Sequence, residues 1–129
     1  MDDADLVALD DRAAAIAEQA YAPYSRFRVG AALRTVAGGV FAGANVENRS
    51  YGLAICAERA AVVQAVAAEG PSMRIAAISV HHPGEGECSP CGACRQVLAE
   101  FSAPDAVVRY RNAAGPAQRP LAELLPDTF

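Results

Sequence analysis

The first part of the chain carries a helical and then a strand-like pattern of apolar positions. Apolar residues recur at helical spacing through residues 6–20, which predicts an amphipathic helix that ends before Pro23. The members of this stripe are Leu6, Leu9, Ala13, Ile16 and Ala20. Apolar side chains then stand at every second position from Val29 to Leu33, as in a strand. Gly38-Gly39 predicts a hairpin turn before a return strand at 40–44.

The rest of the chain alternates between helical and strand-like segments. An Ala- and Val-rich stretch from Cys56 to Glu69, closed by Gly70-Pro71, predicts a helix that is apolar almost all round and is therefore expected to be buried. The later segments are a strand at 74–80, a polar loop at 81–89, a helix from near Cys91 to about Phe101, a strand at 106–110, a turn at Gly115-Pro116 and a short helix at 121–125. This alternation predicts an α/β sandwich with a mixed sheet, formed by a single domain over residues 1–129.

Composition and charge narrow the classes of partner. Hydrophobic residues make up 53% of the 129 positions, which is enough for a real core. All basic residues are Arg, they are scattered, and the formal net charge is -4. A protein that follows a phosphate backbone normally carries a basic stripe. The balance therefore disfavours a nucleic acid polymer and favours an uncharged or weakly charged small molecule.

The N-terminal residues and the apolar runs bear on the compartment. The start, Met1-Asp2-Asp3-Ala4-Asp5, lacks the basic flank and apolar core of a signal peptide, and no apolar run is long enough to span a bilayer. We expect a cytoplasmic protein with no membrane partner. In a reducing compartment, cysteines close in sequence indicate metal binding or catalysis before disulfides.

Three of the four cysteines have the spacing of a zinc site. Cys91 and Cys94 form a C-x-x-C pair, and Cys56 can supply a third sulfur. A catalytic zinc keeps three protein ligands and leaves the fourth place for water. Three thiolates give the ion a formal charge of about −1, so bound water loses its proton only if nearby positive groups offset that charge. The N-termini of the two predicted helices are one source, and Arg59 is another because its guanidinium can donate to a sulfur.

Other interpretations fit the same residues. A C-x-x-C pair alone also occurs in redox motifs and in structural zinc sites, where Cys88 would be the fourth ligand, and buried cysteines can be simple core residues. Glu58 can be an ordinary acid in the first turn of a helix, or it can accept the proton of a metal-bound water and return it to a substrate.

The wider motifs resemble one family. Zinc deaminases carry H-x-E, or its three-cysteine variant, followed by P-C-x-x-C, with the Glu as general acid and base. The matching strings here are Cys56-Ala57-Glu58-Arg59, Ser89-Pro90-Cys91-Gly92-Ala93-Cys94-Arg95-Gln96, Asn45-Val46-Glu47-Asn48, Ser50-Tyr51-Gly52, Tyr21-Ala22-Pro23-Tyr24-Ser25 with Phe27, Val29 and Gly30, and Leu124-Leu125-Pro126. Over nearly the whole chain, the sequence resembles the small, homotetrameric, three-cysteine cytidine deaminases.

This resemblance implies a fold, a reaction and a set of site residues. The fold is a three-layer α/β/α sandwich with about five strands. The reaction is hydrolytic deamination of cytidine and deoxycytidine, as in pyrimidine salvage, with one Zn2+ per subunit held by Cys56, Cys91 and Cys94. Zinc-bound hydroxide attacks C4, and Glu58 shuttles protons. The implied substrate contacts are Asn45 and Glu47 on the sugar hydroxyls, Phe27 on the base, backbone amides near Ala57 on the base carbonyl, and Tyr51 and Phe129 lent by neighbouring subunits of a homotetramer.

Several of these residues also have plain structural interpretations. Asn45 sits where turn chemistry is ordinary, Phe27 can be a strand anchor, Tyr51 can be packing, and Phe129 can be a frayed terminus. Arg59 can be a solvated helix residue. Cys88, His81 and His82 are expected to be idle, structural or solvent-facing, and no role is assigned to Arg49.

Rival functions remain open at the level of sequence. A deaminase of a modified cytosine nucleoside, such as a blasticidin-like antibiotic, would share the zinc motif. The Asn45-Val46-Glu47-Asn48 string keeps this reading second. A polynucleotide editor is disfavoured by charge, and a structural zinc module would make Glu58 dispensable.

Overall fold

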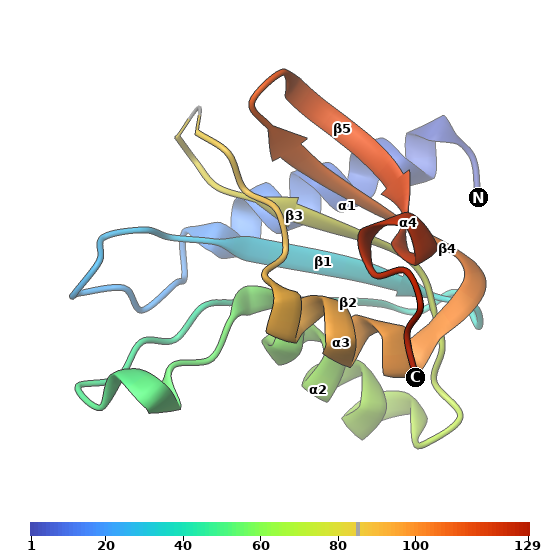
Figure 1. Ribbon diagram of the computed structural model, residues 1–129, viewed down its shortest axis with the longest axis horizontal. Coiled ribbons are helices and arrows are strands. Elements are labelled where there is room, and N and C mark those ends of the chain that lie inside the picture. Colours follow the sequence, from blue (N-terminus) through green and yellow to red (C-terminus); the bar gives the residue numbers. More distant parts are fainter. Residues whose placement is uncertain (85) are drawn as a thin grey trace.

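The computed structural model describes residues 1–84 and 86–129. Its elements are α1 (Asp3–Ala17), β1 (Gly30–Thr35), β2 (Val40–Ala44), the 3-10 helix η1 (Tyr51–Leu53), α2 (Ala57–Glu69), β3 (Ile75–His81), α3 (Gly92–Phe101), β4 (Ser102–Asn112), β5 (Gly115–Pro120) and α4 (Leu121–Leu124) (Figure 1). Apart from η1 and β5, the order of helices and strands follows the predicted alternation.

The strands form one mixed sheet in the order β2-β1-β3-β4-β5. β1 is antiparallel to both β2 and β3, and β4 is antiparallel to β5. β3 and β4 are parallel, which requires a crossover between them, and α3 supplies it. The expected mixed five-stranded α/β sheet is therefore confirmed.

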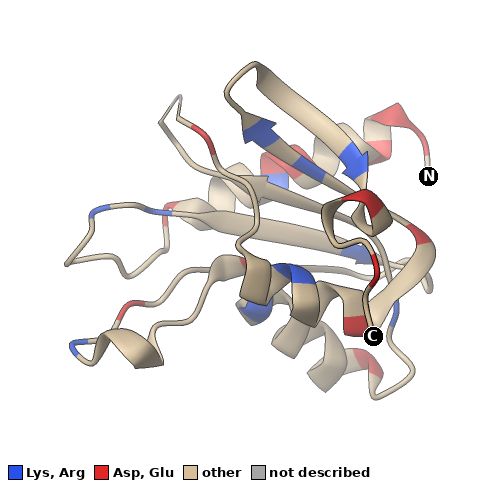
Figure 2. Cartoon of the chain, in the orientation of Figure 1, with Lys and Arg blue, Asp and Glu red and all other residues tan. Residues whose placement is uncertain are grey.

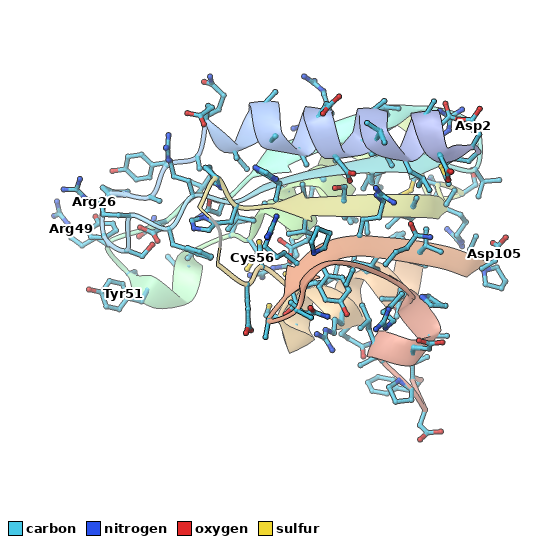
Figure 3. All side chains as sticks on the ribbon, turned by 90° about the horizontal axis from the view of Figure 1, so that it is seen from above. Asp2, Arg26, Arg49, Tyr51, Cys56 and Asp105 are labelled. Carbon is cyan, nitrogen blue, oxygen red and sulfur yellow. The ribbon has the colours of Figure 1, made fainter. Side chains whose placement is uncertain are left out.

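The two faces of the sheet are covered by different helices. α1 lies on one side and the other three α-helices lie on the opposite side (Figures 1 and 3). In β1, Ala32 packs with Leu9 and Ala13 of α1, whereas Ala31 and Leu33 pack into the core formed with α2, α3 and α4. This alternation is the period of two that a strand buried on both faces requires. It gives the three-layer α/β/α sandwich.

α1 is shorter than the apolar stripe predicts. Asp2 and Asp5 form a capping box at its start. The helix ends at Ala17, so Ala20 lies beyond it. The chain leaves the helix because Tyr21 makes a parallel bridge with Val46, with Tyr21 N–H donating to the Asn45 carbonyl at 3.0 Å. A contact between distant segments overrides the local helical pattern here.

The fifth strand was not predicted from the residue pattern. Gly115-Pro116 reads as a turn, but both residues lie in β5, which pairs with β4 in the register Asn112↔Gly115 to Val107↔Pro120. β5 is polar and carries two prolines, which removes the usual strand signal. Prolines are tolerated because β5 is an edge strand and has a partner on one side only.

α2 is not buried all round, which corrects the expectation from its composition. Ala57, Glu58, Ala61, Val62 and Ala65 are buried, and α2 packs on β1 and β2. Val63, on another face of the helix, is 66% exposed in the single chain. An apolar helix face without cover is a candidate contact surface.

Charged residues are interleaved rather than gathered. Figure 2 shows basic and acidic positions alternating over the helices, strands and loops visible in that view. In residues 1–84 and 86–129, none of the helices has the length and hydropathy of a transmembrane span.

Candidate metal centre and active site

The starts of α2 and α3 bring three cysteines together. Cys56 is the N-cap residue of α2, Cys91 is the N-cap residue of α3, and Cys94 lies in the first turn of α3. Their sulfur atoms all lie within 4.8 Å of one another. Cys56 is partly buried and lies near the middle of the view in Figure 3.

This donor set fits a zinc ion. Thiolates are preferred zinc ligands, and two Zn–S bonds of about 2.3 Å reach sulfurs up to about 4.6 Å apart. The Cys94 backbone N–H donates to the Cys91 sulfur at 3.4 Å, so this N-cap side chain accepts from one of the free backbone N–H groups at the start of α3. Cys56 and Cys91 also line a hollow, so a metal held here would be open to a small molecule on one side.

Thiolate character is concentrated on Cys56. A hydrogen bond from Cys94 is the largest effect on Cys56, and together with one from Arg59 it outweighs burial, lowering the pKa of the Cys56 thiol to about 5. The same hydrogen bond raises the pKa of Cys94, so the pair holds one proton on Cys94. Arg59 Nη2 donates to the Cys56 sulfur at 3.4 Å. The guanidinium therefore lies where it can offset sulfur charge.

Glu58 is a buried acid that follows Cys56 by two residues, in the first turn of α2. It is 5% exposed. Burial raises the pKa of its carboxyl, and the charge on Cys56 adds to the rise, against an opposing hydrogen bond from its own backbone. A carboxyl that is easier to protonate than usual suits a group that must both accept and return a proton.

Cys88 is close to the site but is not part of the three-sulfur group. Within the described residues, that group comprises Cys56, Cys91 and Cys94. Cys88 is buried, and burial, together with the charge of Glu58, raises the pKa of its thiol to about 12. Cys88 is therefore set apart by its position, because its sulfur is not one of the three that lie close enough together to share one ion.

One hollow joins the metal residues to the candidate substrate residues. It has a volume of about 400 Å³, which lies within the range of small-molecule sites. Its walls include Phe27, Asn45, Cys56, Ala57, Glu58 and Cys91 from the expected set, together with Val29, Val80, Glu87, Cys88 and Ser89. Of the second group, Val29, Cys88 and Ser89 were named from sequence without a substrate role, whereas Val80 and Glu87 were not singled out because no motif marks them.

Asn45 fixes the segment that carries Phe27. Its Oδ1 accepts from Val29 N–H at 2.8 Å, and its Nδ2 donates to the Phe27 carbonyl at 2.9 Å. The Phe27 ring is 40% exposed and faces the hollow. Asn45 therefore has a structural task, and its amide still has one hydrogen and one lone pair free of these contacts.

Glu47 lies in a neighbouring hollow with Tyr51. That hollow is lined by Tyr24, Ser25, Glu47, Asn48, Tyr51 and Ala54. Glu47 accepts hydrogen bonds from the backbone N–H groups of Tyr24 and Ser25 at 2.9 and 3.1 Å, and from the Ser25 hydroxyl. The hydroxyl bond is the largest cause that lowers the pKa of Glu47, so this carboxylate stays charged.

Two expected substrate residues lie away from the metal group. Tyr51 is 79% exposed and lies at the same end of the molecule as Arg26 and Arg49 (Figure 3). Phe129 is fully exposed at the C-terminus. Neither lines the hollow that contains Glu58.

His82 has a contact that was not expected. The centroid of its ring lies 3.9 Å from that of Phe27, with an interplanar angle of 42°. The sequence offered no signal for this pairing, because residues 27 and 82 meet only when β1 and β3 pair.

Comparisons with known proteins agree with this geometry. The family profile described as "Cytidine and deoxycytidylate deaminase zinc-binding region" matches residues 5–110. A cytidine deaminase of Halalkalibacterium halodurans is 49% identical over 113 residues, covering 87% of this chain and 84% of that protein. A cytidine deaminase of Mycobacterium tuberculosis is 43% identical over 130 residues, covering 100% and 92%.

Solved structures agree as well. The crystal structure of a cytidine deaminase from Burkholderia pseudomallei matches with a TM-score of 0.85 and 49% identity, covering 95% of this chain and 98% of that one. The profile match, the relatives and the three-cysteine centre together place the chain: it belongs to the cytidine deaminase family and carries that family's zinc-binding region.

Proposed function

We propose that this zinc-binding cytidine deaminase hydrolyses cytidine and deoxycytidine to uridine and deoxyuridine with release of ammonia. The observation that carries the proposal is the position of Glu58, a buried carboxyl in the same hollow as Cys56 and Cys91. A structural zinc module has no use for a buried acid with a raised pKa beside an open metal face.

Cys56, Cys91 and Cys94 would hold the zinc ion, which when bound activates a water molecule for attack on C4 of the base. Glu58 accepts a proton from the attacking water and gives it to the ring nitrogen beside C4. A further proton passes through the carboxyl to the amino group, which leaves as ammonia while C4 keeps the oxygen as a carbonyl. Arg59 offsets the excess charge on Cys56.

The remaining walls of this hollow, together with Glu47 from the neighbouring hollow, would orient the nucleoside. Phe27 offers a ring face to the base, and the backbone N–H groups at the start of α2, near Ala57, would donate to the base carbonyl. Asn45 has free amide capacity for a sugar hydroxyl. Glu47 uses three of its four acceptor sites on the 24–25 turn and keeps about one for a hydroxyl.

The charge on Glu47 favours a free nucleoside over a nucleotide. Its pKa is lowered, so it remains a carboxylate at neutral pH and would repel a substrate phosphate. The net charge of -4 further disfavours a nucleic acid polymer. Three thiols must stay reduced to bind the metal, so we infer that the protein acts in the cytoplasm. We also propose that it acts as a single domain over residues 1–129 and has no membrane partner.

A homotetramer with shared active sites is the second part of the proposal. Tyr51 and Phe129 are exposed in the single chain, and Val63 leaves an apolar face of α2 uncovered. Large exposed aromatic and aliphatic side chains are typical of residues that a neighbouring subunit covers. Tyr51 and Phe129 would then complete the active sites of neighbouring subunits.

Ultraviolet absorbance tests the substrate directly. Zinc-loaded protein should consume cytidine and deoxycytidine and accumulate uridine and deoxyuridine. If neither nucleoside is consumed, the proposal is refuted. Faster turnover of a blasticidin-like cytosine nucleoside than of cytidine would replace it with the runner-up activity, a deaminase of modified cytosine nucleosides.

A further inference from the structure

The ring of Phe27 contacts His82, a residue outside the motifs that mark the metal and substrate sites. The backbone on both sides of Phe27 is fixed, because its N–H donates to the Ser25 hydroxyl at 3.0 Å and its carbonyl accepts from Asn45 at 2.9 Å. These bonds fix the Cα position but leave the side-chain torsions free. The contact that bears on the ring itself is the one with His82, with the two centroids 3.9 Å apart.

The His82 ring is itself fixed on two sides. Its Nδ1 lies 2.8 Å from the Arg28 carbonyl oxygen. A carbonyl only accepts, so Nδ1 carries the proton in this contact. On the other edge, a Cβ at Gly84 would lie 2.8 Å from His82 Nε2, which shows how closely the loop backbone approaches the ring. The hydrogen bond on one edge and the close loop backbone on the other restrict the orientation of the imidazole.

We propose that His82 is a positioning residue that fixes the tilt of the Phe27 ring and so shapes the surface on which the base packs. The inference rests on the proposed function, since it takes Phe27 as the platform for the base. His82 makes the contact from the position just after β3, whereas Glu58 and the three cysteines lie at the starts of α2 and α3. Loss of His82 should therefore weaken binding and leave zinc content and the chemical step largely intact.

Two variants test this from different directions. His82→Ala removes the ring, and Gly84→Ala leaves His82 in the sequence but places a methyl group where the imidazole lies. Aromatic pairs contribute enough to predict a rise of about fivefold in KM for cytidine in both variants, with kcat within about twofold of wild type. His82→Phe keeps a ring against Phe27 and should recover part of the loss.

Matched controls lie in the same segment. His81→Ala removes the adjacent imidazole, which belongs to β3 and has its own neighbours. Gly86→Ala adds a Cβ where no atom lies within 4 Å. Both should leave KM within about twofold of the wild-type value, the usual result for a surface change.

A double-substitution cycle decides the mechanism. In a Phe27→Leu background, His82→Ala should add less than about twofold to KM, because the ring it positions is gone. An unchanged KM in His82→Ala, or the same fold-change with and without Phe27, would overturn the inference. Inactive wild-type protein would refute the proposed function and with it this inference. An unchanged KM in Phe27→Leu would refute the role of Phe27 as the platform for the base, and with it this inference. An affected Phe27→Leu beside a normal His82→Ala refutes the inference alone.

Discussion

At the scale of single residues, the most informative group is Arg59. Its guanidinium donates to the Cys56 sulfur at 3.4 Å and helps to lower the pKa of that thiol. Three thiolates make a metal a weak Lewis acid, so the activity should depend on this contact as well as on the ligands.

Arg59→Ala should therefore reduce kcat/KM for cytidine by about tenfold or more while zinc still binds, because groups behind metal ligands typically contribute that much. Arg59→Lys keeps the charge but not the planar guanidinium, so its kcat/KM should lie between those of wild type and Arg59→Ala. Steady-state kinetics with metal analysis on the same samples checks this, with the exposed Arg12→Ala as control. Wild-type kinetics in Arg59→Ala would show that the contact with Cys56 has no catalytic consequence.

At the scale of elements, a two-pronged ion pair between Asp10 and Arg109 ties α1 to β4 of the sheet. Arg109 of β4 makes a two-pronged contact with Asp10 at 2.9 and 2.6 Å, and Ser79 of β3 donates to the same carboxylate at 2.7 Å. Burial acts against the charge on Asp10, but the bonds from Arg109 and Ser79 outweigh it and lower its pKa.

Asp10→Asn should lower the free energy of unfolding at pH 7 by about 1–2 kcal/mol, a modest value because the Asp10 side chain is 37% exposed. A lowered pKa in the folded state stabilises the protein above the unfolded value, near pH 4, and that gain disappears as pH falls through the folded value. The difference between variant and wild type should thus shrink below about pH 4.

Urea unfolding at neutral and acid pH measures this difference in unfolding free energy. An effect of zinc release that is the same in both proteins drops out of the difference. Asp11→Asn, a neighbouring exposed acid, should stay within about 0.5 kcal/mol of wild type. A pH-independent difference for Asp10→Asn would mean that its charge is not what stabilises the contact.

Close packing of α2 on β2 depends on Gly43. A Cβ there would lie 2.5 Å from Ala61 N and 2.8 Å from the Ala60 carbonyl carbon, both backbone atoms that cannot move aside cheaply. Because α2 carries Cys56 and Glu58, this spacing sets the depth of the site.

Gly43→Ala should cost about 3 kcal/mol of stability by forcing the helix away from the sheet. Thermal unfolding checks the value, with Gly86→Ala, where a Cβ meets open space, as the matched control. Equal melting temperatures for the two variants would contradict the packing account.

The sequence predicts the elements wherever local pattern and tertiary contacts agree. The return strand at 40–44 and the helix that begins at Cys56 come out as predicted because turn glycines and an apolar period mark them. β5 was missed because its stability comes from pairing with β4, and the end of α1 was misplaced because Tyr21 pairs with Val46. The metal ligands are adjacent in motifs, whereas the contact between Phe27 and His82 depends on the folded sheet.

At the scale of the whole molecule, the account requires subunits to share their sites. Val63 and Val36 are nearly equally exposed, at 66% and 65%, but Val63 lies on α2, one of the two helices that carry the site, and Val36 lies on the β1–β2 turn. They form a matched pair for testing which face is covered in the assembly.

If the proposed tetramer covers Val63, Val63→Glu should dissociate it and abolish turnover by exposing incomplete sites, because a buried charge at an apolar contact is strongly unfavourable. Val36→Glu should leave both unchanged. Sedimentation velocity with activity measured on the same fractions tests the pair. Full activity of a monomeric Val63→Glu protein would show that one chain suffices.

The central claim is that the three cysteines hold a zinc ion and that Glu58 moves protons beside it. Its most direct test is zinc content and cytidine turnover measured together on wild type and Glu58→Gln, which keeps the size of the side chain. We predict one zinc ion per subunit in both proteins, with turnover in the variant reduced at least about a hundredfold. Turnover by Glu58→Gln close to that of wild type at equal zinc content would contradict the account.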